Sequence, residues 1–404
     1  MAASDLEAGT FYFGNPAAPE PLTALTIDPA FCEAESLENQ CRVYGARHRV
    51  TMEGGDEVGL SYSHTVIDGE NSADHHDPTK WVGWDLKRGK ANWQLQYLDF
   101  GTNGFLYECA LDAEDACAQV DPSLPGAARC EGNFSHEFVV TEESTLGRRI
   151  LLTDTGNDRL ITAWLPEGEL CGEVEEVLHT GMGGWDVYSG PNSLQHRVDD
   201  DGARMLLSFR DAETVSAAGR AQHGGPGHGK VTQWVRRDDG WEQEWEVPPA
   251  LDGDSSFLNV PHGALWAEGP AGEPWLVVAH SLGTSASFMA IDGGSIAVFD
   301  LSSGEPKYLY DGIAPDGAFF GFPRDIEPLG DGQFVIVDSG CISSTDCPVP
   351  SQAWVVRLPS GDSAGLDGAF RPDHSHQVFV EIEMVEGPFL ADTLLLYSIT
   401  GARD

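Results

Sequence analysis

A repeat of 60 to 66 residues runs through the chain and limits its fold more than any other feature of the sequence. Each unit opens with a short segment that carries a basic side chain, at His136, His196, His262 and Arg324. A polar turn follows, and then two runs of β-branched, aliphatic and aromatic residues. Because one such unit is too small to bury its apolar face alone, the repetition predicts units that stack on their neighbours.

The runs inside each unit have the length and composition of β-strands, and helical periodicity is almost absent from the chain. Fainter copies of the unit occur around Arg47–Val50 and His376–Phe379, so the units cover nearly the whole length. Three strands and a variable fourth fit one unit, which is the make-up of a propeller blade. We therefore expect an all-β fold, a six-bladed β-propeller, with seven blades as the alternative.

The propeller is expected to form a single domain over residues 31–404. Residues 1–30 are expected to form an N-terminal extension and closing strand, so that the ring is closed by N- and C-terminal strands. An open blade would leave an unpaired sheet edge. The segment Asp199–Gly202 is typical of a hairpin turn, and Trp275–His280 is typical of a second strand in a blade. Ser281 then ends a strand and does not form the nucleophile turn of a hydrolase.

The chain is strongly acidic. It has 23 Lys and Arg against 65 Asp and Glu, which gives a formal net charge of -42. Such a surface repels phosphate backbones and anionic lipids, so we expect no nucleic-acid partner and no membrane-surface role. No run approaches the ~20 apolar residues of a membrane-spanning helix. Solubility in salty surroundings accounts for the charge, with attraction of a cationic partner as the alternative. No oligomeric state is predicted.

The eight cysteines show neither the paired C-x-x-C spacing of a zinc site nor a redox C-x-x-C. Three pairs are close in sequence and elimination leaves a fourth, so the expected disulfides are Cys32–Cys41, Cys109–Cys117, Cys341–Cys347 and Cys130–Cys171. Disulfides of this kind imply an oxidising compartment. We expect an extracytoplasmic protein, periplasmic or secreted, whose export signal has been removed. A cytosolic chain with free thiols is the alternative.

If the units are blades, residues at one repeat position line the central channel and converge at one end of it. His136, His196, His262 and Arg324 hold this position, and Arg210 is expected near its rim. The three imidazoles should then approach a common point within roughly 4–8 Å. A single loop histidine would ordinarily bond a neighbouring blade, but four polar side chains in register favour a functional site.

Two chemistries suit this arrangement. The three histidines can bind zinc or another transition metal and leave one position open for water or substrate. Alternatively, one histidine is a nucleophile or base, while the others and Arg324 and Arg210 hold an anion. The arginines favour the anion-binding alternative. A guanidinium donates two parallel hydrogen bonds to sulfate or phosphate, whereas a divalent cation repels it. Calcium is a further alternative at Asp199–Gly202 and Asp252–Asp254, although hairpin turns explain both segments.

Three segments resemble the arylsulfotransferase-type propeller family. Asn192–Arg210 resembles its signature of Asn-Ser, an Asp/Gly turn and a strand ending in Ser-x-Arg. Pro261–Ala264 and Val337–Gly340 resemble two later motifs of that family. The resemblance implies a PAPS-independent, extracytoplasmic enzyme without a cofactor, which moves sulfate between phenols through a sulfated histidine on a six-bladed propeller. Its substrate would be a small anionic aryl ester.

The chain departs from this family at two positions. Pro191 and Arg324 stand where the family commonly has histidine. The identity of the nucleophile is therefore open, with His262 as the first choice and His196 as the second.

The segment Asp154–Arg159 resembles the NHL-type propellers. That group includes the zinc-dependent peptidyl-amidoglycolate lyase, whose metal histidines sit in Pro-His motifs like Pro261-His262. This second resemblance implies a metal-dependent lyase or hydrolase with His136, His196 and His262 as metal ligands. Other members only bind partners, so a non-catalytic binding propeller is the third alternative. Fold alone does not decide between them.

Overall fold

The structure is a computed structural model. It describes residues 2–5, 10–13, 23–26, 40–52, 55–65, 79–85, 90–99, 106–109, 117–120, 131–132, 137–154, 159–166, 173–180, 191–209, 229–247, 258–281, 294–314, 320–338, 352–359, 377–384 and 396–400. Every regular element in these ranges is a β-strand, as the sequence predicts. No helix in them has the length and hydrophobicity needed to cross a bilayer.

Two larger sheets and one hairpin of the described chain contain residues from its N-terminal third. One joins both chain ends and consists of β28 (Leu396–Thr400), β1 (Ala2–Asp5), β2 (Thr10–Phe13) and β3 (Thr23–Thr26). The other consists of β4 (Gln40–Met52), β5 (Gly55–Thr65), β6 (Thr79–Asp85), β7 (Lys90–Asp99) and β10 (Glu131–Gly132). A separate hairpin is formed by β8 (Leu106–Cys109) and β9 (Cys117–Val120).

Four further sheets carry the repeat. The first two are β11 (Phe138–Ser144), β12 (Gly147–Asp154), β13 (Arg159–Pro166) and β14 (Glu173–His179), then β15 (Pro191–Asp199), β16 (Gly202–Phe209), β17 (Lys230–Arg237) and β18 (Gly240–Val247). The third is β19 (Asn259–Glu268), β20 (Pro274–Ser281), β21 (Gly294–Asp300), β22 (Lys307–Ile313) and β26 (Gln377–Phe379). The fourth is β23 (Pro323–Gly330), β24 (Gln333–Asp338), β25 (Gln352–Arg357) and β27 (Glu381–Met384).

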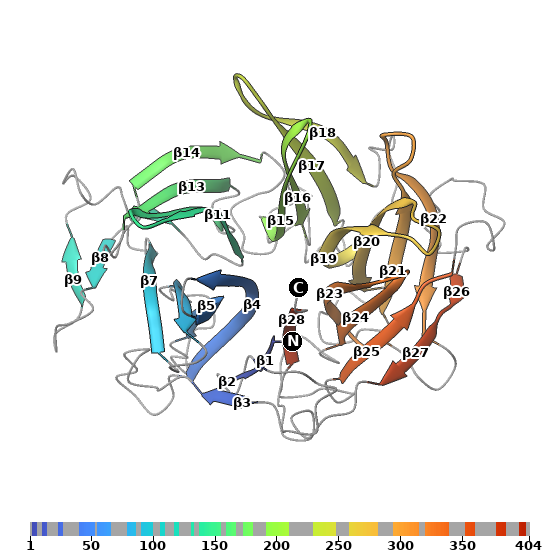
Figure 1. Cartoon of the computed structure of the whole chain (residues 1–404), viewed down its shortest axis with the longest axis horizontal. Helices are drawn as coiled ribbons and strands as arrows, with labels where there is room; N and C mark the ends of the chain where they lie inside the picture. The colour runs from blue at the N-terminus through green and yellow to red at the C-terminus, as the bar shows by residue number, and fades with distance from the viewer. Residues whose placement is uncertain are drawn as a thin grey trace, which may run out of the picture.

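The sheets stand around a common centre like the blades of a propeller (Figure 1). One strand of each sheet lies innermost, and each inner strand contacts the next in the order β4, β11, β15, β19, β23, β28 and back to β4. The predicted all-β propeller architecture is therefore confirmed. Whether the complete chain has six or seven blades stays a prediction, as do the domain boundaries at residues 30 and 31.

The sheet that holds both chain ends pairs β28 with β1 in antiparallel register, with Ala3 opposite Ile399. A strand from the C-terminal part of the chain thus lies innermost in a sheet whose outer strands come from the N-terminal part. Pairing between N- and C-terminal strands is expected from the sequence, and β1 and β28 pair in this way.

The core lies between neighbouring blades. The central strands β16, β20 and β21 are buried on both faces, which explains their nearly continuous apolar runs. Val277 packs toward the blade that begins with β23, whereas Leu276 and Val278 pack toward the blade that begins with β15. The outer strand β18 alternates instead, with exposed Glu242 and buried Trp245. Two-sided burial of the middle strands therefore couples the described blades that carry the repeat.

Two smaller sequence predictions are also confirmed. Asp199 and Gly202 close the tight turn between β15 and β16, and Gly202 has a positive φ of 121° that a residue without a Cβ adopts readily. Ser281 ends β20 and begins no helix, so the segment is a strand as expected. The cysteine side chains lie outside the described residues, and the disulfides stay predictions, although Cys109 and Cys117 are register partners in the β8–β9 hairpin.

The two faces of the propeller differ in how they connect the strands. Short hairpins join the first strand to the second and the third to the fourth on one face, for example at residues 145–146, 200–201 and 238–239. The inner strands begin on the other face. The longer connections from the second strand to the third, such as residues 210–228 and 282–293, also start and end there. We call this second side the loop face. Loops on a rigid scaffold are where binding and catalytic groups concentrate.

Candidate functional site

Three consecutive inner strands have a shift in strand pairing near their loop-face ends. Strand pairing shifts between Pro191 and Ser193 in β15, between Asn259 and Gly263 in β19, and between Pro323 and Asp325 in β23. Each shift contains a proline followed by a polar residue. A β-bulge of this kind re-aims a side chain, and bulges are common next to active sites.

The polar residues in the three bulges are Asn192, His262 and Arg324. Their side chains are almost completely buried, with exposed fractions of 3%, 3% and 5%. Burial of polar groups is unfavourable unless they find partners. Three polar side chains at one repeat position of three neighbouring inner strands therefore mark the candidate site.

The aromatic ring of Phe322 brings two of these groups together. The His262 ring lies edge-on to it, with ring centroids 4.9 Å apart and an interplanar angle of 70°. The Arg324 guanidinium carbon lies 4.9 Å from the same ring centroid. An imidazole and a guanidinium from neighbouring blades therefore contact the same buried ring.

A chain of hydrogen bonds links the strand of Asn192 to His262. The hydroxyl oxygens of Ser193 and Ser208 lie 2.7 Å apart, and the Ser193 backbone N–H donates to Ser208 Oγ. Ser208 Oγ in turn donates to the His262 carbonyl oxygen at 3.5 Å. Within the described residues, Asn192 Nδ2 has no hydrogen-bond acceptor, so this donor is available to a ligand.

The predicted register is wrong for His196. This residue lies further along β15, opposite Met205, and is only half-buried, with its ring centroid 6.5 Å from that of Trp241. Asn192 holds the position equivalent to His262. The predicted alignment of the repeats is therefore four residues out of step in this strand, and alternation does not reveal such an error because it repeats every two residues.

His136 and Arg210 lie outside the described residues. The residue after His136 is described: Glu137 is buried, its carbonyl accepts from the Thr153 backbone N–H at 2.9 Å, and its Oε2 accepts from the Leu194 N–H at 2.7 Å. Glu137 therefore joins β11 to the inner strand of the next blade. The predicted convergence of three histidines is not found among the described residues, which include no group of three His, Cys, Asp or Glu side chains able to hold a metal.

Sequence reasoning missed Asn192 and Phe322 as parts of the site. A signal for Asn192 was present, because Pro191-Asn192, Pro261-His262 and Pro323-Arg324 repeat the same Pro-polar pair. No sequence pattern indicates Phe322, whose importance comes from its contact with another blade. Chemically, a guanidinium, an amide donor and an imidazole suit an anion and a nucleophile that attacks it.

No family model and no curated protein matches the chain. Among solved structures, it is similar to a Lactobacillus plantarum protein, at 15% identity over 81% of this chain and 80% of that one, with a TM-score of 0.32. It is also similar to a family-43 β-xylosidase/α-arabinofuranosidase from a compost microbial metagenome, at 12% identity over 81% and 94% with a TM-score of 0.37. A third is a GH43 enzyme from Xanthomonas citri complexed with xylotriose, at 13% identity over 88% and 91% with a TM-score of 0.35.

Likeness at this level carries no inference about the chemistry of this chain. Two of the three structures are glycoside hydrolases, and the resemblance to arylsulfotransferases or NHL-type propellers stays a prediction.

Proposed function

We propose that the chain is a propeller enzyme that binds a small anionic aryl ester, an aryl sulfate, at the loop-face end of its inner strands and transfers the sulfuryl group through His262. The contact of both His262 and Arg324 with Phe322 carries the proposal. In this proposal the His262 imidazole is the nucleophile and the Arg324 guanidinium is the fixed cation. Both side chains are buried, and electrostatic interactions are stronger away from water.

In the proposed reaction, an imidazole nitrogen of His262 forms a bond to sulfur while the bond from sulfur to the aryl oxygen breaks. The phenolate leaves and takes up a proton. The oxygen of a second phenol then attacks sulfur, the N–S bond breaks, and the acceptor's proton is released as the imidazole is restored. Arg324 would hold the sulfuryl oxygens in both steps, and Asn192 Nδ2 would donate a further hydrogen bond.

The test is aryl-sulfate-dependent sulfation of a phenol by the purified protein. His262→Ala should lower kcat by about 10³-fold or more, because it removes the nucleophile. Arg324→Lys should lower it by about 10²-fold, because lysine keeps the charge but not the planar fork. Mass spectrometry of the rapidly quenched wild-type protein should find the sulfuryl group on the peptide that contains His262.

His196→Ala is the matched control, because it removes an imidazole from the neighbouring inner strand outside the bulge. Its activity should stay within about twofold of wild type, since substitutions away from a site have small effects. Equal rates for wild type and His262→Ala, or a loss confined to His196→Ala, would refute the assignment. An extracytoplasmic location and a cofactor-free reaction belong to the same proposal.

A further inference from the structure

The segment that carries Phe322 and Arg324 is held by the blade before it. Gly294, at the start of β21, donates its N–H to the Phe320 carbonyl at 2.5 Å. The Pro323 ring packs so closely on Gly294 that a Cβ there would lie 2.2 Å from Pro323 Cδ. Gly294 of β21 therefore holds residues 320–323 through a backbone hydrogen bond and a close packing contact.

Asp338 holds the same segment from its own blade. This residue ends β24 and is completely buried. Its Oδ2 accepts from the Gly321 backbone N–H and its Oδ1 from the Phe322 backbone N–H, both at 2.7 Å. Hydrogen bonds to an ionised carboxylate are short and roughly twice as strong as neutral ones. One side chain thus fixes two successive peptide units just before the bulge.

The position of Asp338 explains why it bonds these two groups. Asp338 is the register partner of Pro323, which has no N–H to give to the strand ladder. The two N–H groups immediately before the proline take its place. A carboxylate opposite this proline is not required in every blade. The equivalent proline of β15, Pro191, has Phe209 as its register partner. In the blade of β15, a phenylalanine thus stands where β24 has this carboxylate.

We infer that Asp338 is a positioning residue: by clamping the backbone of Phe322, it sets the place of the ring that orients the His262 imidazole and the Arg324 guanidinium. The inference rests on the proposed function for its effect on catalysis, but its effect on His262 can be measured without any activity. Both carboxylate oxygens are needed, because an asparagine would turn an NH₂ group toward one of the two N–H donors.

The experiment compares Asp338→Asn with wild type by two measurements. The first is the ¹³Cε1–¹H signal of His262 as a function of pH, assigned among the 13 histidines by its loss in His262→Gln. The signal should move and its titration midpoint should shift in Asp338→Asn, while the His196 signal stays in place. The second is sulfuryl transfer, for which kcat should fall about tenfold to a hundredfold with KM within about threefold, as expected for misplaced groups.

Asp311→Asn is the matched control. Asp311 is also a completely buried carboxylate. It lies in the blade that carries His262 and bonds His280 and Ser295 there, whereas the two N–H groups before Pro323 bond Asp338. This variant should lose thermal stability without moving the His262 signal. An unchanged His262 signal in Asp338→Asn, with a stability loss like that of Asp311→Asn, would show a purely structural role and overturn the inference.

Phe322→Leu tests the same chain of contacts if Asp338→Asn does not fold. It keeps the clamp and removes the ring, so it too should move the His262 signal, and an unchanged signal would overturn the inference. If the wild-type protein transfers no sulfuryl group, the proposed function fails. The His262 signals still decide whether Asp338 positions the imidazole.

Discussion

At the scale of single residues, one group of buried polar side chains is satisfied by its own members. His280, Ser295 and Asp311 lie on the neighbouring strands β20, β21 and β22 and are completely buried. The His280 Nε2 atom lies 2.9 Å from Ser295 Oγ and 3.1 Å from Asp311 Oδ1. Because both contacts use the same imidazole nitrogen, the cluster does not have the arrangement of a Ser-His-Asp catalytic triad. Its hydrogen bonds connect three neighbouring strands and stabilise their sheet.

Tyr310 provides a prediction about alkaline pH. Its ring is fully buried, and its hydroxyl donates to the Pro359 carbonyl at 2.8 Å. Burial, with a smaller contribution from the negative charge of Glu273, raises the pKa of Tyr310 well above its usual range. A raised pKa means that the fold favours the neutral phenol. The resulting stability is present below the unfolded pKa of about 10 and is lost as pH rises above it.

The measurement is a phenolate titration at 295 nm. Wild type should keep one tyrosine un-ionised until the protein unfolds, and the Tyr310→Phe variant should lack that late step. The variant's free energy of unfolding should also fall less steeply between about pH 10 and 12 than that of wild type. A wild-type titration that is complete before unfolding would contradict the prediction.

The sequence placed His262 and Arg324 near the starts of inner strands, where the structure also has them, but it placed His196 there wrongly. Alternation and turn residues report which face of a strand a side chain occupies, but they do not report a bulge. The contacts that complete the site, from Phe322 to His262 and from Asp338 to Gly321, depend on long-range packing. No periodicity in one sequence encodes them.

At the scale of strands and blades, a glycine and a proline lock two pairs of neighbouring blades in the same way. Gly229 at the start of β17 receives the Pro261 ring of the next blade, and its N–H donates to the Leu258 carbonyl. Gly294 and Pro323 repeat this arrangement one blade further on. Each lock sits directly beside a bulge, so blade packing and site geometry are fixed at the same point.

The Gly294→Ala variant tests the lock. A Cβ would meet the Pro323 ring and also lie 3.3 Å from the His280 carbonyl oxygen, so backbone must move. We expect a loss of about 1–3 kcal/mol in the free energy of unfolding, measured by urea titration. Gly304→Ala is the control: it has a positive φ but open space around it, and should lose only about 1 kcal/mol. A loss no larger than in the control would argue against the lock.

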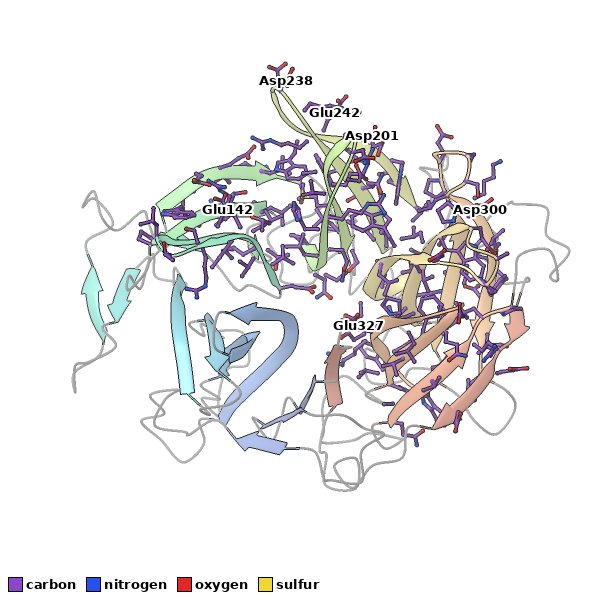
Figure 2. The ribbon with its side chains drawn as sticks, viewed as in Figure 1. Glu142, Asp201, Asp238, Glu242, Asp300 and Glu327 are labelled. Carbon is purple, nitrogen blue, oxygen red and sulfur yellow. The ribbon has the colours of Figure 1, made fainter. Side chains whose placement is uncertain are left out.

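The outer strand β18 carries carboxylates on its exposed positions. On β18, Glu242 and Glu244 are exposed, and Figure 2 shows Glu242 and the hairpin residue Asp238 at the rim of their blade. Charges on an edge strand discourage pairing with the edge of another molecule. Part of the acidic composition therefore has a local structural role, which the total charge alone does not reveal.

At the scale of the whole molecule, the repeat predicted the propeller well, because burial between blades imposes the same pattern on each unit. The net charge of -42 has a separate consequence. Figure 2 shows labelled carboxylates in several blades, from Glu142 to Asp300 around the outside and Glu327 nearer the centre. Repulsion among such charges opposes the compact state and is screened by salt, with a Debye length of about 10 Å at 0.1 M.

The melting temperature should therefore rise by at least about 5 °C between 0.02 and 1 M NaCl at pH 7, because screening removes repulsion that unfolding would otherwise relieve. The control is the same series near the isoelectric point of about 4.3, where the net charge is close to zero and the rise should disappear. Calorimetry gives both values. A salt-independent melting temperature at pH 7 would show that the surface charge does not limit stability.

The pairing of β28 with β1 has a consequence for the order in which the fold is completed during synthesis. The strands β1 to β3 are made before the other described strands, yet the strand that lies innermost in their sheet is residues 396–400. Until the ribosome has released that segment, β1 keeps one edge without its final partner, and such edges are prone to pair with other molecules. The protein thus completes its first sheet last, and a chain interrupted before residue 396 would lack the inner strand of that sheet.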